Sequence, residues 1–173
     1  GGISGTLNTS ATFNTLSVGG NLTINNGGKL NGFSQTQSPT AGGATVVVSG
    51  NLNLNAGSAF CIAHSGAILM LNGTTPQSIN GPGAFLGNIV RTLRISNPTS
   101  VTVNIPITLT NITSNNGLDL MAGTLNTNGN VTLDATGQIY GNAYNQQVYT
   151  VVVTAIGSGY DAQPTVTISA PSG

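Results

Sequence analysis

Apolar and polar residues alternate through much of this chain of 173 residues. Residues 101–109, VTVNIPITL, place an apolar side chain at every second position, and Leu22 and Ile24 flank Thr23 in the same way. A period of two with one apolar face is typical of a half-buried β-strand. No long segment has the helical period, and the abundant Thr, Asn, Ser, Gly and Val are poor helix formers. The pattern therefore predicts an all-β protein.

An eleven-residue phrase occurs three times, as GNLTINNGGKL at 20–30, GNLNLNAGSAF at 50–60 and GNVTLDATGQI at 129–139. Each copy holds two alternating apolar residues, a run of turn-forming residues and a third apolar residue, which predicts a strand, a corner and another strand. The predicted inward residues are Leu22, Ile24, Leu30, Leu52, Leu54, Phe60, Val131, Leu133 and Ile139. The predicted corner glycines are Gly27, Gly28, Gly57 and Gly137.

Repetition of this unit predicts a right-handed parallel β-helix, that is, a β-solenoid. One coil cannot bury its apolar face alone, whereas coils stacked about 4.8 Å apart pair their backbones and share a core. Outward Asn and Thr can then stack on their own kind. Tandem β-sandwiches are the alternative, because sandwich strands also alternate and turn at short intervals. Sandwiches do not, however, predict that one phrase recurs together with its corner.

We expect two regions, a solenoid over residues 1–145 and a small β-hairpin-like module over 146–173 that is a cap or the start of another module. The polar segment 33–44 is interpreted as a loop inserted in one turn. SGTLNT at 4–9 returns as AGTLNT at 122–127, each followed by a copy of the phrase, which suggests a longer repeat. The chain itself reads as a fragment of a longer protein.

Charged residues make up only 3% of the chain and its net charge is zero. A nucleic-acid-binding protein needs a basic surface, and so does a protein that attaches to an anionic membrane, so neither partner is expected. No apolar run approaches the roughly 18–20 residues that span a bilayer, so no membrane insertion is expected. Cys61 is the only cysteine, which excludes an internal disulfide.

Three longer segments carry a family resemblance, namely LNGTTPQSI at 71–79, TLRISNPTSVTVNIPITLTNI at 92–112 and AGTLNTNGNVTL at 122–133. Together they resemble the repeat region of large secreted surface adhesins of Bacteroidota, a group that includes gliding-motility adhesins and proteins exported by type IX secretion. The resemblance implies a filamentous protein at the cell surface or outside the cell. Its partners would be neighbouring repeats of the same polypeptide, and a surface polysaccharide or abiotic surface.

Catalysis is disfavoured by the residues present. Asp119, Asp134 and Asp161 are the only carboxylic side chains, and a glycosidase needs two held close together. Cys61 and His64 could suggest a thiol nucleophile and its base, but their odd spacing along a strand points them to opposite faces. We therefore expect no enzyme and no cofactor.

The tail offers two candidate binding features. Asp161, within GSGYDAQP, is a weak candidate for a calcium ligand, since one carboxylate alone binds weakly. The tyrosines gather toward the C-terminus and could form a sugar-stacking surface or pack a module junction: Tyr140, Tyr144, Tyr149 and Tyr160.

Three functions remain open. The first is a structural stalk or filament segment of a secreted adhesin, which supplies rigidity and reach for attachment or gliding. The second is a glycan- or surface-binding module that uses an outward Thr/Asn face or the tail tyrosines. The third is a segment of a phage tail fibre or spike, because the tail GSGYDAQPTVTI also resembles a motif of phage structural proteins.

Overall fold

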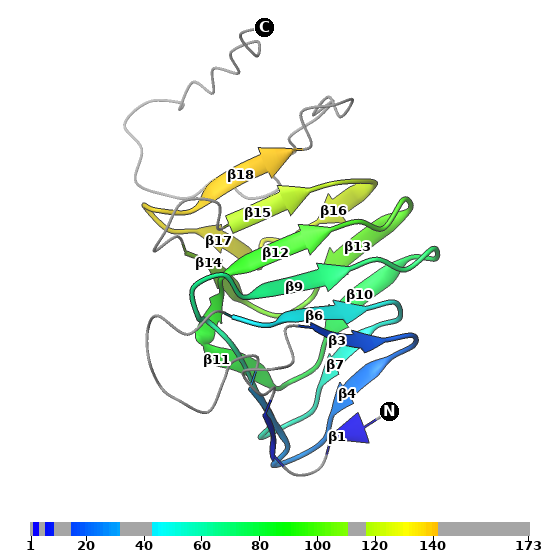
Figure 1. Ribbon diagram of the computed structural model, residues 1–173, viewed down its shortest axis with the longest axis vertical. Coiled ribbons are helices and arrows are strands. Elements are labelled where there is room, and N and C mark those ends of the chain that lie inside the picture. The colour runs from blue at the N-terminus through cyan, green and yellow to red at the C-terminus, as the bar shows by residue number, and fades with distance from the viewer. Residues whose placement is uncertain (1, 4–5, 9–14, 32–42, 111–116, 142–173) are drawn as a thin grey trace, which may run out of the picture.

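A computed structural model describes residues 2–3, 6–8, 15–31, 43–110 and 117–141. Within these residues the chain forms eighteen β-strands in three sheets of six, and no helix. Every strand pairs in parallel with strands of adjacent coils, on both sides except at the two ends of each sheet, and never with its neighbour in sequence. The predicted parallel β-solenoid is therefore confirmed (Figure 1).

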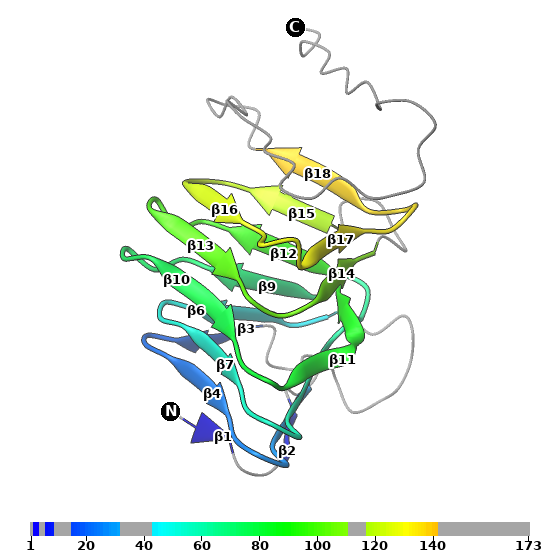
Figure 2. The ribbon, with the colours of Figure 1, turned by 180° about the vertical axis from the view of Figure 1, so that it is seen from behind.

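The chain visits the three sheets in strict rotation. Sheet A contains β1 Gly2–Ile3, β4 Leu22–Ile24, β7 Leu52–Leu54, β10 Gln77–Asn80, β13 Ser100–Val103 and β16 Thr124–Asn126. Sheet B contains β2 Thr6–Asn8, β5 Lys29–Asn31, β8 Ala59–Ile62, β11 Ala84–Val90, β14 Ile107–Leu109 and β17 Val131–Leu133. Sheet C contains β3 Thr15–Val18, β6 Thr45–Val48, β9 Ile68–Leu71, β12 Thr92–Ile95, β15 Gly117–Leu120 and β18 Gln138–Gly141. Figures 1 and 2 show the coils climbing from β1 to β18 in a right-handed sense, the hand favoured for parallel crossovers.

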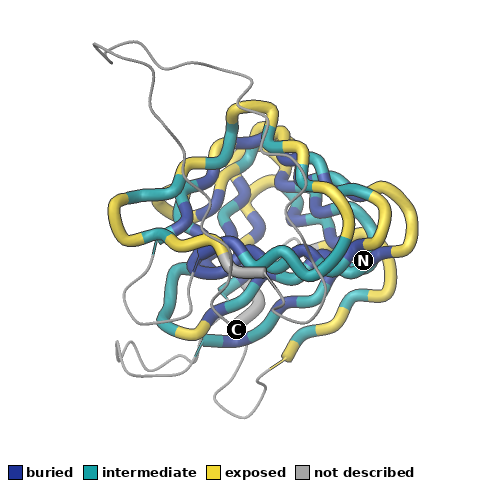
Figure 3. Tube along the Cα trace, turned by 90° about the horizontal axis from the view of Figure 1, so that it is seen from above, coloured by how far each residue is buried: buried dark blue, intermediate teal, exposed yellow. Residues whose placement is uncertain are grey.

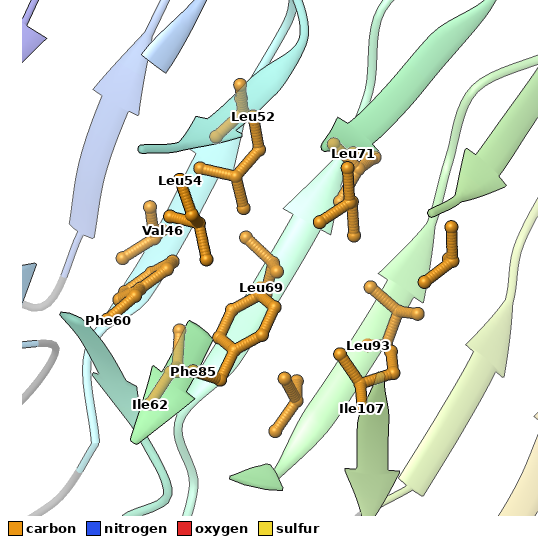
Figure 4. Close-up of a cluster of buried hydrophobic side chains, with 14 of the residues drawn as sticks. Val46, Leu52, Leu54, Phe60, Ile62, Leu69, Leu71, Phe85, Leu93 and Ile107 are labelled. Atoms are coloured by element: carbon orange, nitrogen blue, oxygen red, sulfur yellow. The ribbon is translucent and has the colours of Figure 1, made fainter. Parts of the chain in front are cut away.

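The three sheets enclose one apolar core. Viewed along the stack, buried positions line the inside of the coil and many exposed positions lie at its bends (Figure 3). Inward residues of one coil sit on inward residues of the next: Leu30 pairs with Phe60, and Phe60 with Phe85, whose ring lies 5.3 Å from it. Figure 4 shows these rings among aliphatic side chains from all three sheets. Each such side chain contributes roughly 1.5–3 kcal/mol on burial.

Two of the three corners have nearly constant length. Corners from sheet A to sheet B comprise residues 25–28, 55–58, 81–83, 104–106 and 127–130, and those from sheet C to sheet A are similarly short. Corners from sheet B to sheet C differ widely: 9–14, 32–44, residue 91 alone, 110–116 and 134–137 are examples. The loop expected at 33–44 falls at this third corner, largely outside the described residues. Length variation is thus concentrated along one edge of the solenoid.

The three copies of the phrase do not occupy equivalent positions. In the first two, the phrase runs from sheet A to sheet B, and Leu22 pairs directly with Leu52. The third runs from sheet B to sheet C, over β17 and β18. TLN at 6–8 and TLN at 124–126 likewise belong to different sheets. The longer repeat expected from the sequence is therefore not a whole number of coils; the phrase encodes a strand–corner–strand unit that fits either corner.

The predicted core residues are buried in the first two copies of the phrase but not in the third. Leu22, Ile24, Leu30, Leu52, Leu54 and Phe60 are buried. In the third copy, Val131 and Leu133 are only partly buried, and Ile139 is 57% exposed, contrary to expectation. The reason is position, since β17 and β18 are the last described strands of their sheets. The module expected over 146–173 lies outside the described residues.

The four predicted corner glycines differ in backbone conformation. Gly27 and Gly57 occupy the third position of β-turns with φ of 73° and 70°, which favours glycine. Gly28 follows as the fourth residue and donates its N–H to the Asn25 carbonyl. Gly137 is also a fourth residue, without positive φ, and Thr136 stands where the other copies have glycine. The special backbone therefore belongs to Gly27 and Gly57 rather than to all four.

Candidate functional site

The outer side of sheet A, the sheet that contains β4, β7, β10 and β13 in Figure 2, carries uncharged polar residues on successive strands. We call it the amide face and define it by two rows that run along the stack. The first row is Asn21, Asn51, Ser78, Thr102 and Asn126; the second is Thr23, Asn53, Asn80, Asn104 and Asn128. None of these residues carries a charge, so the face offers hydrogen bonds without an electrostatic preference.

Asparagines of the second row form an amide ladder. The Nδ2 of Asn80 donates to Oδ1 of Asn53 at 3.3 Å, and that of Asn104 to Asn80 at 2.7 Å. Asn128 continues the ladder by donating to Asn104 at 2.8 Å. At the adjoining corner, Asn55 donates to Asn25 at 3.4 Å. The stacking of Asn predicted from the sequence is thus observed, and it holds these amides in fixed orientations.

A buried polar clasp joins successive coils where sheet C leads into sheet A. Gln77 Nε2 donates to the carbonyls of Val48 and Gly50, and its Oε1 accepts from the Gly73 N–H at 2.7 Å. The same Oε1 accepts from Asn97 Nδ2 at 2.9 Å. Since Gln77 is 3% exposed and has all its hydrogen-bonding capacity used, its burial is compensated.

Asn97 completes the clasp on the following coil and is fully buried. Its Nδ2 also donates to the Thr75 carbonyl at 2.7 Å, and its Oδ1 accepts from both the N–H and the hydroxyl of Thr99. Gln77 and Asn97 belong to the segments TTPQSI and SNPTS that carry the family resemblance. The arrangement fixes register between coils and leaves no free polar group for a ligand.

The corners from sheet B to sheet C hold three ionisable side chains, His64, Arg91 and Asp134. Arg91 is 5% exposed, and its guanidinium donates to the Ala63 carbonyl and to the Thr110 hydroxyl. Burial lowers the pKa of Arg91, and the charge of Asp134 acts in the opposite direction. Burial also lowers the pKa of His64, as does the positive charge of Arg91. His64 therefore favours its neutral form here.

Asp134 is held by its own turn. Its Oδ1 accepts from the Thr136 hydroxyl at 2.7 Å and from the backbone N–H groups of Thr136 and Gly137, each at 2.8 Å. Hydrogen bonds from Thr136 lower the pKa of Asp134, with smaller contributions from Gly137 and Arg91 in the same direction. The Asp134 carboxylate thus stabilises this corner through side-chain hydrogen bonds. The corresponding corners of the other two copies instead have a glycine with positive φ.

Cys61 lies on β8 at outward parity yet is buried. Burial raises the pKa of its thiol, against a smaller opposing effect of a backbone hydrogen bond with Ala63. A buried thiol with a raised pKa is a poor nucleophile, because the thiolate is the reactive form. The environment of Cys61 and that of His64 therefore both favour neutral side chains rather than an activated pair.

The remaining sequence candidates are dispersed. Asp119, outward on sheet C, forms an ion pair with Arg94 on the adjacent strand at 2.6 Å, rather than facing Asp134. Tyr140 pairs with Asp119 in backbone register on β18. Tyr144, Tyr149, Tyr160 and Asp161 lie outside the described residues. Among the described residues, no three His, Cys, Asp or Glu side chains gather as a metal site would require.

Sequence reasoning missed the clasp and the buried arginine. One signal was present: Gln77 stands two residues before the inward Ile79, so alternation places an amide inside the coil. No comparable signal marks Arg91, because its burial depends on the one-residue corner between β11 and β12.

In the part of the chain that the structure describes, there is no helix with the length and apolarity needed to cross a membrane. Comparison with known proteins found no matching family model, no similar curated protein and no similar solved structure.

Proposed function

We propose that this β-solenoid module is a stalk segment of a large secreted, cell-surface adhesin, where it provides a rigid spacer for attachment or gliding. One observation carries the proposal. All three sheets run without interruption along the described stack, so every coil rests on the next through backbone pairing and an apolar core. Six strands per sheet correspond to a length of about 24 Å at ~4.8 Å per strand.

The sequence resemblance to adhesin repeats supports the cellular setting, and the stacking of successive coils supports the mechanical role. A solenoid lengthens by adding coils, each of which contacts only its neighbours. The natural partners of such a segment are therefore adjacent repeats of the same polypeptide.

A surface-display experiment tests the stalk role. The chain is placed between a bacterial outer-surface anchor and a fluorescent reporter, and reporter retention and height are measured after protease treatment. Leu54→Asp puts a charge in the core and should release the reporter, whereas the adjacent Asn53→Asp faces outward and should retain it. Equal protease sensitivity of both variants, or a wild-type chain that adds no height, would refute a rigid spacer.

The amide face favours a second candidate function, the binding of a neutral polysaccharide. Its ladder amides are fixed before any ligand arrives, which lowers the entropic cost of binding. Asn104 and Asn128 each use one amide N–H within the ladder, so further donors remain for a ligand. A ligand with repeating hydroxyl groups would fit such repeating rows.

This candidate is tested by sedimentation with insoluble neutral polysaccharides. Thr102→Lys places a charge in the middle of the amide face, and Thr108→Lys places the same charge at an outward position of sheet B. If Thr102→Lys abolishes binding and Thr108→Lys preserves it, the result would support the amide face as the polysaccharide-binding surface. No binding by the wild-type chain, or equal loss in both variants, would leave the stalk role alone.

A further inference from the structure

Two exposed turns contain Asn–Gly pairs in open surroundings. Asn26–Gly27 and Asn128–Gly129 are the central residues of β-turns, and all four residues are exposed. At Gly27 and Gly129 nothing lies within 4 Å of the position that a Cβ would take. The Gly129 N–H has only a long contact, 3.4 Å, with the Thr127 hydroxyl. Each of these two glycines therefore has open space on one side of its backbone.

Two other Asn–Gly pairs are held tightly. At Asn72–Gly73 the glycine is buried, and its N–H donates to Gln77 Oε1 at 2.7 Å within the clasp. At Asn80–Gly81 the asparagine amide makes three hydrogen bonds, donating to Ser78 at 2.6 Å and to Asn53 at 3.3 Å and accepting from Asn104 at 2.7 Å, whereas the Asn128 amide, at the end of the ladder, makes one. A Cβ on Gly81 would lie 1.9 Å from the Leu54 carbonyl oxygen, which shows how close the neighbouring coil is.

We propose that Asn26 and Asn128 are sites of spontaneous deamidation, from which the fold protects Asn72 and Asn80. The glycine nitrogen attacks the asparagine Cγ, forming a C–N bond while the Cγ–Nδ2 bond breaks. Ammonia leaves with the proton of the glycine nitrogen, and a cyclic imide remains. One water molecule then opens the imide to aspartate or isoaspartate, so the net change is water consumed and ammonia released, with no oxidation or reduction.

At Asn128 the modification would alter the amide ladder. Asn128 Nδ2 donates to Asn104 Oδ1 at 2.8 Å, and a carboxylate has no hydrogen to donate there. The reaction would place a negative charge against that acceptor oxygen and would add a charge to a chain whose net charge is zero. The end of the ladder would thus be weakened as the protein ages.

The test follows the rate of conversion at each pair by peptide mass spectrometry during incubation in mildly alkaline buffer, with and without urea. In the folded chain, Asn26 and Asn128 should convert at least about tenfold faster than Asn72 and Asn80, a factor equivalent to ~1.4 kcal/mol of local opening. In urea the four rates should converge. Equal rates in the folded chain, or faster conversion at Asn72 or Asn80, would overturn the proposal.

A matched variant identifies the attacking nitrogen. Gly129→Ala adds a methyl group beside that nitrogen and should slow conversion at Asn128, while Asn26 in the same molecule serves as the internal control. If Asn128 converts at an unchanged rate relative to Asn26, reaction through the Gly129 nitrogen is wrong.

Discussion

Single polar residues decide how the coils are held in register. Apolar burial alone tolerates small shifts between coils, because one aliphatic side chain packs on another in many ways. The hydrogen bonds of Gln77 and Asn97 do not tolerate such shifts, because these two side chains form buried hydrogen bonds between neighbouring coils. A buried polar group that loses its partners is costly, so these two amides penalise every other register.

Substitution of the clasp glutamine should therefore be severe. Gln77→Ala leaves the Gly73 N–H and one Asn97 N–H without partners, and it removes one of the two hydrogen bonds that the Val48 carbonyl accepts. We expect a loss of at least about 3 kcal/mol in the free energy of unfolding, measured by urea denaturation. Thr74→Ala, an exposed change in the same segment, should cost no more than about 0.5 kcal/mol. Similar midpoints for the two variants would argue against the clasp.

His64, the only histidine, predicts how stability changes in weak acid. Its pKa is lowered in the folded chain by burial and by Arg91, so the unfolded chain binds its proton first as pH falls. The contribution of neutral His64 to the free energy of unfolding is fully present above the unfolded pKa of about 6.5. It is lost as the pH falls through the lower pKa of the folded chain. The urea midpoint should decrease between about pH 7 and pH 5.

His64→Gln is the control for this pH dependence. It removes the titrating group while keeping a polar side chain, and its midpoint should stay level over the same range. Asp134, whose pKa is also lowered, acts at more acidic pH and does not confuse the comparison. A decrease of the same size in His64→Gln would show that another group is responsible.

At the scale of the element, the alternating pattern predicted which segments form strands, but it did not predict to which of the three sheets a strand belongs. Alternation identified β4, β7 and β13, because one face of each strand is buried. The sequence could not show that the third copy of the phrase lies at a different corner, because a short strand, a turn and another strand have the same local pattern at either corner. Only pairing with the adjacent coil distinguishes the two positions, and pairing is not visible within a single copy.

Strand β11 shows a second limit of prediction. Phe85 pairs with Phe60 and Val90 with Ile62, so extra residues bulge out between them. Gly87 and Asn88 adopt positive φ within that bulge. The letters GNIV at 87–90 resemble the start of the recurring phrase, although here they form a bulge rather than a new strand. The arginine corner that follows the bulge was equally invisible to periodicity.

Corner lengths predict where insertions are tolerated. A short Gly-Ser insertion within the polar segment 33–44 falls at the variable corner and should cost less than about 1 kcal/mol, since loop closure depends weakly on length. The same insertion between Ala56 and Gly57 disturbs the Asn55–Asn25 contact and the Ser58 turn, and should cost at least about 2 kcal/mol. Thermal unfolding of the two variants measures the difference, and the reverse order would contradict it.

At the scale of the whole molecule, one distance defines the solenoid. Outward residues of sheet C form a row in which Thr15 stands beside Thr45 and the row ends at Gln138 on β18. If the coils are stacked, Thr15 and Gln138 are separated by about 24 Å and Thr45 and Gln138 by about 19 Å, at ~4.8 Å per strand. A stalk further requires that both distances be narrowly distributed.

Pulsed electron paramagnetic resonance measures both distances. Spin labels are attached through Thr15→Cys with Gln138→Cys, and through Thr45→Cys with Gln138→Cys, in a Cys61→Ser background. Our account predicts two narrow distributions whose maxima differ by one strand spacing, about 4.8 Å, because label length cancels in the comparison. Broad distributions, or maxima that do not differ by one spacing, would contradict a rigid stack of coils.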